Sequence, residues 1–340
     1  MACFARSTGR VRAPFRVAGV LSIGSVAAGI VVLVWVMRDV LHTVFTFGDG
    51  AGAQSGILAS VVWRTALRLH DPDSERSHAR LRSAGPLIVL LALALWVGQL
   101  TLSWALIFVP SAFEGSSSAT FGDRFVFAGK TVIGRAGNSP ELSVTSGTWE
   151  AVHGVAGLSG VTLVSIGLAY VLPILGGVAD KRSVAAHINA LGPSVGEIKE
   201  TVGRAGGGQI ELHLIALVTQ VSETAERHRT YPVLHYFHSN DRHAALAPAI
   251  AKLVLLLEDG LDAAPAADAT VFEPLNRAIR NLLEAVAKMG LYDYATRIDS
   301  GELNDIGLHE GNGGNEVLPN RAWIDTYVRF DGWNTSDIAI

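Results

Sequence analysis

A short run in the middle of the chain contains residue types that can coordinate a dehydrated cation: Thr131-Val132-Ile133-Gly134-Arg135-Ala136-Gly137. Selectivity filters strip the water from an ion and replace it with rows of backbone carbonyls. Glycine permits such a backbone, because it adopts positive φ without steric strain. The uncharged residues 83–113 and 151–179 flank the run. The pattern Thr-x-x-Gly-x-x-Gly between two apolar segments therefore predicts a pore loop, a short helix that enters the membrane and returns as extended backbone.

The composition is typical of a membrane protein. Of the 340 residues, 49% are hydrophobic and only 17% are charged, whereas soluble proteins usually carry about 25% charged residues. The apolar surplus lies before residue 180, and the first block, 17–37, is long enough to cross a bilayer, which takes about 20 residues. This block exceeds the about 7–15 apolar residues of a signal peptide and lacks a small-x-small cleavage motif, so we expect a retained helix.

Charge, cysteine content and motifs exclude several classes of function. The formal net charge of −4 and the lack of a nucleotide-binding motif give no reason to expect nucleic acid or nucleotide binding. The single cysteine, Cys3, excludes an internal disulfide and a cysteine-based zinc site. No pattern indicates an enzyme or a cofactor. Residues 228–243 fit either a zinc site or a partly buried aromatic turn, and Pro232 favours the turn because it interrupts helical spacing. Four histidines lie in this segment: His228, His235, His238 and His243.

The residue pattern divides the chain into five segments. We expect an N-terminal segment with the first transmembrane helix (1–47), a cytoplasmic linker (48–85), a pore domain (86–179), a helical cytoplasmic domain (180–298) and a flexible tail (299–340). The linker has apolar residues at helical spacing, which fits a helix on the membrane surface or a short helix packed on the C-terminal domain. Basic residues near the spans do not distinguish the two sides of the membrane, but the size and solubility of the C-terminal part favour the cytoplasm.

The third apolar segment is rich in glycine and carries a proline near its inner end. Small residues let helices approach closely, and proline kinks a helix. We expect these residues to form a packing face and a gating element: Gly154, Gly157, Gly160, Gly167 and Pro173. His153, at the outer end of the same segment, is expected at the membrane interface.

Residues 86 to about 176 resemble the pore module of the two-transmembrane pore-domain potassium channel family. The order of elements is the same: an outer helix, a short aromatic-bearing pore helix, a filter that begins with threonine, and an inner helix. The family's filter reads Thr-x-Gly-Tyr-Gly-Asp. Thr131 and Gly134 match its threonine and first glycine, with two residues between them in place of one, whereas residues 135–137 read Arg-Ala-Gly in place of Tyr-Gly-Asp.

Together with the first apolar block and the helical pattern of residues 180–298, this resemblance implies an all-α membrane protein with three transmembrane helices, a re-entrant pore loop between the second and third, and a helical cytoplasmic C-terminal domain. It also implies a homotetramer in the bilayer of the inner (cell) membrane, because one hairpin supplies a single wall of a pore. The implied function is a passive ion channel that conducts potassium, or cations with weak selectivity, without a cofactor.

Two departures from the family's filter indicate an alternative. A residue with a Cβ costs about 1–2 kcal/mol in a left-handed conformation, so Ala136 would strain a filter. One arginine charge about 4 Å from a cation costs about 4 kcal/mol at an effective dielectric of 20, so four copies of Arg135 facing an axis would exclude cations. The alternative is a non-conducting, channel-like membrane anchor or sensor for the cytoplasmic domain.

Overall fold

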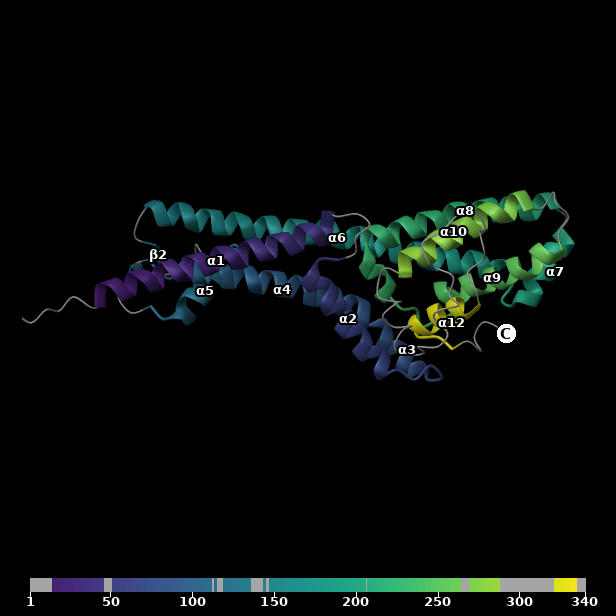
Figure 1. Ribbon diagram of the computed structural model, residues 1–340, viewed down its shortest axis with the longest axis horizontal. Coiled ribbons are helices and arrows are strands. Elements are labelled where there is room, and N and C mark those ends of the chain that lie inside the picture. The colour runs from purple at the N-terminus through teal and green to yellow at the C-terminus, as the bar shows by residue number, and fades with distance from the viewer. Residues whose placement is uncertain are drawn as a thin grey trace, which may run out of the picture. The chain divides into compact units, whose positions relative to one another are not determined.

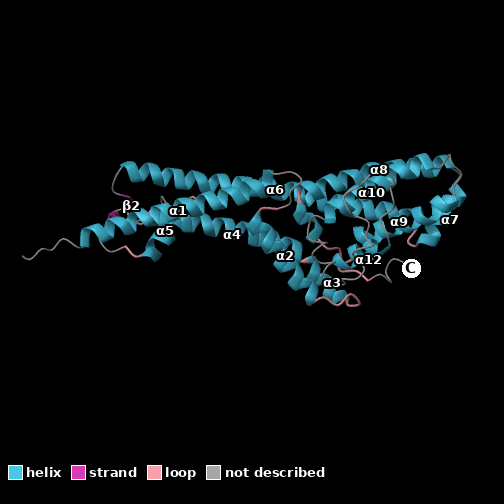
Figure 2. Cartoon of the chain, in the orientation of Figure 1, coloured by secondary structure: helices cyan, strands magenta, loops and turns pink. Residues whose placement is uncertain are grey.

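The chain is built almost entirely from helices (Figure 1). The computed structural model describes residues 14–45, 51–111, 113–114, 119–135, 143–144, 147–205, 207–263, 269–287 and 321–334. Within these ranges the strands are β1 (Phe113–Glu114) and β2 (Ser143–Val144), with two residues each (Figure 2). The chain divides into two compact units. Residues 1–40 and 93–168 form the hairpin unit, and residues 41–92 and 169–340 form the helical unit.

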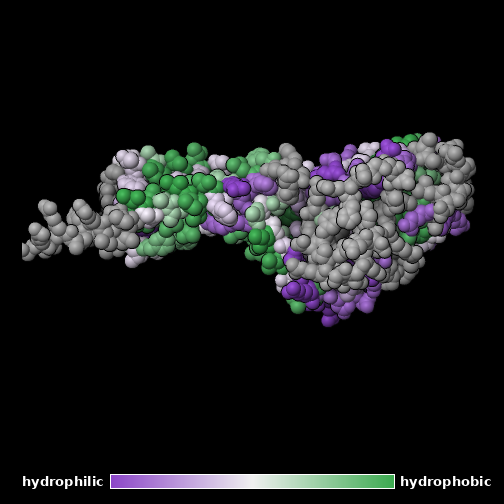
Figure 3. Space-filling model, viewed as in Figure 1, coloured by the Kyte–Doolittle hydropathy of each residue, from purple (hydrophilic) through white to green (hydrophobic). Residues whose placement is uncertain are grey.

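Three helices are long and apolar enough to cross a membrane: Ser22–Phe45, Glu75–Ile107 and Gly147–Leu191. A bilayer core takes about 20 helical residues, so each helix exceeds the requirement. Large apolar side chains lie exposed on all three, as contact with lipid requires. Figure 3 shows apolar surface gathered where Figure 1 labels α1 (Pro14–Phe45). The three predicted spans are thereby confirmed as membrane-capable helices.

In the hairpin unit, α1 and α4 (Ala84–Ile107) are joined by a buried polar contact and a close crossing. Trp96 Nε1 donates a 2.9 Å hydrogen bond to the carboxylate of Asp39, and both side chains are buried. Gly29 allows the crossing, because a methyl group there would lie 2.7 Å from the carbonyl oxygen of Ser103. Polar groups within a span are costly unless they are bonded, so the Asp39–Trp96 contact stabilises this pair of helices.

A short helix, α5 (Phe121–Val132), lies between α4 and α6 (Gly147–Leu191) in the sequence. β1 follows α4 and pairs antiparallel with β2, which precedes α6, so the two ends of the intervening segment meet. A capping box begins α5, because Thr120 accepts a hydrogen bond from the N–H of Asp123 and the Asp123 carboxylate accepts one of 2.8 Å from the N–H of Thr120.

The helical unit combines the first turns of α4 and the last turns of α6 with shorter helices. Apolar residues within 211–221, 246–257 and 272–286 lie on helices and supply much of the core of this unit. The shorter elements, including the 3-10 helices η2 and η3, are α2 (Ala53–Arg68), α3 (Glu75–Arg82), α7 (Val195–Ala205), α8 (Gly207–Thr230), η2 (Pro232–Tyr236), η3 (Arg242–Ala244), α9 (Leu246–Ala263), α10 (Ala269–Val286) and α12 (Arg321–Phe330).

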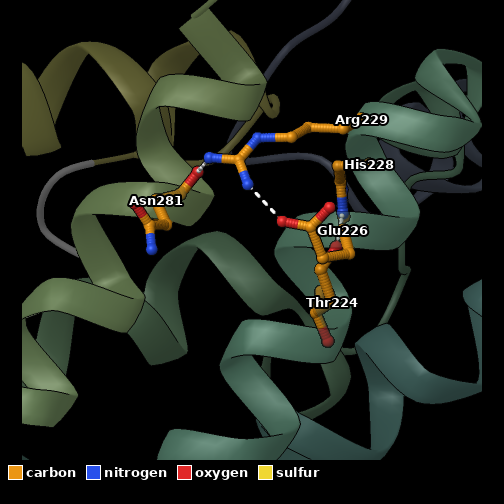
Figure 4. Close-up of polar contacts among 5 residues, drawn as sticks. All are labelled: Thr224, Glu226, His228, Arg229 and Asn281. Carbon is orange, nitrogen blue, oxygen red and sulfur yellow. Dashed lines mark hydrogen bonds and ion pairs between the residues drawn. The ribbon is translucent and has the colours of Figure 1, made fainter. Parts of the chain in front are cut away.

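The helices α8 and α10 pack side by side, and Arg229 links them near the end of α8 (Figure 4). Its guanidinium pairs with Glu226 on α8 and donates a 3.3 Å hydrogen bond to the carbonyl oxygen of Asn281 on α10. The neighbouring His228 ring bonds the carbonyl oxygen of Thr224 at 2.8 Å. Burial is the main cause that lowers the pKa of His228 to about 3, so this ring is neutral within the packed core.

The linker helix α2 combines features of both alternatives that its sequence allows. Trp63 is buried, and its ring centroid lies 5.8 Å from that of His235 and 5.5 Å from that of Tyr236. This packing matches a helix docked on the C-terminal part. Ile57 and Val61 remain exposed on the same helix, which matches a helix at a membrane surface.

Part of the tail that was predicted to be flexible is an ordered helix. α12 buries Trp323 and Tyr327, and the Phe330 ring stacks on His235 with centroids 4.4 Å apart. Residues 299–320 and 335–340 lie outside the described residues, as do 288–298. The apolar residues Trp323, Ile324 and Tyr327 stand out in this polar segment of the sequence, and all three are buried.

Candidate functional site

The predicted filter begins inside a helix rather than as extended backbone, because Thr131 and Val132 form the last turn of α5. The helix then ends in a Schellman motif. The N–H of Gly134 donates to the carbonyl of Thr131 at 3.0 Å, and the N–H of Arg135 donates to that of Lys130 at 2.7 Å. Gly134 has φ +76°, the left-handed conformation that this cap requires. The glycine that matches the filter pattern therefore ends the helix.

The side chain of Thr131 is buried and forms hydrogen bonds within the hairpin unit. It is only 2% exposed, and its hydroxyl donates a 2.9 Å hydrogen bond to the carbonyl of Phe127. His153 Nε2, on α6, lies 3.0 Å from the same oxygen. Because the only hydroxyl hydrogen goes to Phe127, His153 Nε2–H is the donor. His153 thus holds the end of α5 against α6.

Two of the predicted packing glycines receive the end of α5. A methyl group at Gly160 would lie 2.0 Å from the carbonyl oxygen of Val132, so only glycine fits there. A methyl group at Gly157 would lie 3.8 Å from the carbonyl oxygen of Thr131. Small residues allow this approach of helix to backbone. The carbonyls of Thr131 and Val132 are therefore directed at α6 of the same chain.

The other predicted residues of α6 have different surroundings. A methyl group at Gly167 would lie 2.9 Å from Leu93 Cδ2 on α4, so this glycine also sits in a packing contact. Gly154 has no neighbour within 4 Å of such a methyl group. Pro173 lies inside α6, which continues through it as a helix. A gating role for these residues stays a prediction.

The rest of the predicted filter divides into an exposed part and a part outside the described residues. Ile133 and Arg135 are exposed after the end of α5. Ala136 and Gly137 lie outside the described residues. Extended backbone with carbonyls facing an axis is therefore not observed at Thr131–Arg135.

A cavity of about 470 Å³ lies in the helical unit. Its volume falls in the range of about 300–1,000 Å³ that is common for ligand pockets. One wall is apolar and comes from the spanning helices: Pro86, Leu87 and Leu90 of α4, with Val178 of α6. The polar lining consists of Arg82, Ser83, Lys181, Arg182, His238, Ser239 and Asp331.

Two glycines bring the segment after α8 against the spanning helices. A methyl group at Gly85 on α4 would lie 2.8 Å from the carbonyl oxygen of Tyr236, and one at Gly177 on α6 would lie 2.7 Å from Leu234 Cδ1. These close contacts place η2 against both helices. The residues that follow η2, including His238, consequently line the cavity.

Lys181 is a buried cation in the cavity wall, with 7% of its surface exposed. Its Nζ donates hydrogen bonds of 3.0 Å and 3.2 Å to the carbonyl oxygens of Leu234 and Phe237. Among the described residues, no carboxylate lies within ion-pair distance of it. Its charge is therefore stabilised by backbone dipoles and contributes to a positive potential in the cavity.

A hydrogen-bonded pair of histidines lies beside the cavity. His78 Nδ1 and His238 Nε2 are 2.8 Å apart, while the outer nitrogens bond the backbone carbonyls of Pro72 at 2.9 Å and Asp331 at 2.8 Å. Carbonyl oxygens only accept, so the outer nitrogen of each ring is the donor to its carbonyl. Trp333 stacks on His78 with centroids 4.3 Å apart.

Burial shifts the pKa of Asp331 and of His238, which both line the cavity. It raises the pKa of the Asp331 carboxyl to about 7, although the Lys181 ammonium favours the ionised form. Burial, followed by repulsion from His78, lowers the pKa of His238 to about 3. Asp331 is therefore about half protonated at pH 7 and largely neutral at lower pH.

The histidines of residues 228–243 are dispersed rather than gathered around one point. His228 lies on α8 and bonds the carbonyl of Thr224 in the same helix, His235 stacks on Phe330, and His243 is exposed. In the part of the chain that the structure describes, no group of three metal-ligating side chains is arranged so that it could hold a metal ion. His78, the partner of His238, is 160 residues away in the sequence, so no local signal could have predicted the pair.

The three apolar helices and their exposed apolar faces define the chain as a membrane protein. It is similar to the uncharacterized membrane protein YdjJ of Bacillus subtilis (strain 168), with 28% identity over 240 residues. The matched region covers 68% of this chain and 67% of that protein. No protein-family model and no solved structure matches the chain.

Proposed function

We propose that the protein is a non-conducting membrane sensor, in which a channel-like hairpin anchors a cytoplasmic helical part that carries a ligand-binding cavity. The single observation that carries this proposal is the end of α5. The carbonyls of Lys130 and Thr131 accept hydrogen bonds from the backbone of the Schellman cap, and the carbonyl of Val132 lies against Gly160.

A filter requires carbonyls that are free to replace the water around an ion. In this chain the first carbonyls of the matching run are used to end a helix and to pack against α6. Arg135 then adds a positive charge directly after the cap, which disfavours cations nearby. The geometry thus supports an anchor more strongly than a conduction pathway.

Potassium flux into liposomes tests the proposal. The natural full-length protein should give the flux of empty vesicles, while a potassium channel reconstituted in parallel verifies the assay. A second protein carries Ile133→Gly, Arg135→Tyr, Ala136→Gly and Gly137→Asp, which place Gly-Tyr-Gly-Asp, the end of the family's filter, at residues 134–137. Flux through the natural protein, above that of empty vesicles, would overturn the proposal whatever the restored protein does.

The cytoplasmic location of the C-terminal part is a component of the proposal. After Cys3→Ser, a cysteine introduced at the exposed Glu284 on α10 should resist an impermeant thiol reagent in intact cells. Labelling of this cysteine without lysis would place α10 outside the cell and contradict the component.

A passive ion channel, for potassium or weakly selective for cations, is the second candidate. The observation that favours it is the apolar face that α5 exposes: Phe125 is 39% and Val126 is 54% exposed in a single chain. Further copies of the hairpin, as in a homotetramer, would cover this face. Mass measurement in mild detergent distinguishes a tetramer from a monomer, and a monomer would remove this candidate.

A further inference from the structure

We propose that the cavity of the helical unit binds the phosphate headgroup of an anionic phospholipid, whose acyl chains lie along the exposed leucines of α4. This inference deepens the proposed function, because it names the ligand class of the sensor's cavity. It does not depend on whether the hairpin conducts.

The cavity lies where two spanning helices change from apolar to charged sequence. Arg82 and Ser83 immediately precede α4, whose residues carry no charge, and Lys181 and Arg182 follow the uncharged residues 151–179 of α6. Such a change marks the depth of lipid headgroups in a spanning helix. Both polar edges of the cavity therefore sit at the level of phosphate groups.

The charges around the cavity favour an anion. Arg82 and Arg182 are exposed, and within the described ranges neither has a carboxylate at ion-pair distance. Lys181 adds a third, buried cation. Among the described residues that line the cavity, Asp331 alone carries a carboxyl group, so cationic side chains outnumber it three to one there. Basic pockets between spanning helices at this depth are suited to anionic headgroups.

The apolar wall distinguishes a lipid from a soluble phosphate. Leu87 is 47% exposed and Leu90 is 64% exposed, and their spacing of three residues puts them on one face of α4. A small hydrophilic anion gains nothing from this face. A phospholipid contacts it with its acyl chains while its phosphate lies near the guanidinium groups, so a single ligand uses both parts of the cavity.

Titration of the purified full-length protein with lipid tests the inference. Short-chain phosphatidylglycerol, short-chain phosphatidylcholine and inorganic phosphate are added separately, and lipid retention is followed by native mass spectrometry together with the midpoint of thermal unfolding. Phosphatidylglycerol should be retained and should raise the midpoint, whereas the other two should not. Equal binding of both lipids, or an equal shift by inorganic phosphate, would overturn the inference.

Variants locate the binding to the cavity. Arg82→Gln with Arg182→Gln should weaken phosphatidylglycerol binding by about 30-fold, or about fivefold for each arginine. Arg80→Gln is the matched control, because Arg80 is an exposed arginine of α3 that does not line the cavity. If the double variant binds as tightly as the control, the cavity is not the site.

The apolar wall has its own matched pair of variants. Leu90→Asn should weaken binding of phosphatidylglycerol, because it places an amide where acyl chains would lie. Leu172→Asn changes an equally exposed leucine of α6 that does not line the cavity and should leave binding unchanged. Equal effects of the two variants would contradict a lipid bound along α4. These results are independent of ion flux, so failure here is distinct from failure of the non-conducting proposal.

Discussion

At the end of α5 and at the cavity of the helical unit, a glycine lies close to the backbone of another segment. The two regions differ in whether their polar groups bond within the fold or border a cavity. At the end of α5, backbone groups bond one another and pack against Gly160, so they are used within the fold. At the cavity, Lys181 and Asp331 are buried in a wall that borders empty space. A closed polar arrangement stabilises structure, whereas charged groups beside a cavity can respond to a ligand.

The largest effect that we expect concerns Asp331. Its carboxyl group is neutral up to about pH 7 when folded but ionises near pH 3.8 when unfolded, so the folded state binds an additional proton between these values. Stability from this group is therefore lost as pH rises from about 4 to 7. The free energy of unfolding of Asp331→Asn, relative to that of the natural protein, should therefore increase by about 3 kcal/mol between pH 5 and pH 8.

Thermal unfolding in detergent at both pH values measures this difference. Glu284→Gln, at an exposed carboxylate of α10, is the control and should show no such gain. The neutral buried His228 and His238 destabilise the fold in acid, but they are present in both proteins and cancel. If the two proteins differ in stability by the same amount at pH 5 and at pH 8, Asp331 is ionised at both pH values and the prediction is wrong.

The second-largest change in stability is expected from a substitution at the contact between α5 and α6. Gly160→Ala places a methyl group 2.0 Å from the carbonyl of Val132, and such overpacking should cost about 2–3 kcal/mol. Gly154→Ala is the matched control on the same helix, because nothing lies within 4 Å of its methyl group. The unfolding midpoint should fall only for Gly160→Ala. Equal midpoints would mean that α5 does not end against α6.

Loss of Lys181 tests how the cavity wall is held. Lys181→Met removes the donor to the carbonyls of Leu234 and Phe237, and an unsatisfied buried carbonyl costs about 2 kcal/mol. Arg182→Met changes the exposed neighbouring cation and should have little effect on the unfolding midpoint in lipid-free detergent. If both variants unfold alike, the carbonyl contacts of Lys181 do not stabilise the wall.

The smallest change in stability is expected from a substitution in the helix cap at the end of α5. Gly134→Ala keeps open space around the side chain but forces a Cβ into a backbone with φ +76°, which should cost about 1 kcal/mol. Gly98→Ala, in α4 with nothing within 4 Å, controls for the general effect of alanine in a helical span. A midpoint for Gly134→Ala at or above that of the control would argue against the Schellman cap.

The sequence contains enough information for the spans but not for the function of the run between them. The long uncharged stretches predict membrane helices because hydropathy alone determines insertion. Thr131 and Gly134 were ambiguous, because a filter and a helix cap both use a glycine with positive φ. Only the hydrogen bonds of Gly134 and Arg135 distinguish the two.

The cavity could not be predicted from the sequence, because its lining comes from separate segments. Arg82 belongs to α3, Lys181 to α6 and Asp331 to the turn after α12. The sequence of residues 228–243 favoured a partly buried aromatic turn over a zinc site, but it did not reveal that His238 pairs with His78. Local spacing cannot reveal such long-range partners.

Single-channel recording of the purified full-length protein in planar bilayers tests the central claim most directly. We predict a silent bilayer under a potassium gradient, because the carbonyls of Lys130, Thr131 and Val132 are engaged within the hairpin unit. Unitary currents that reverse at the potassium equilibrium potential would contradict the closed helix cap and establish the channel instead.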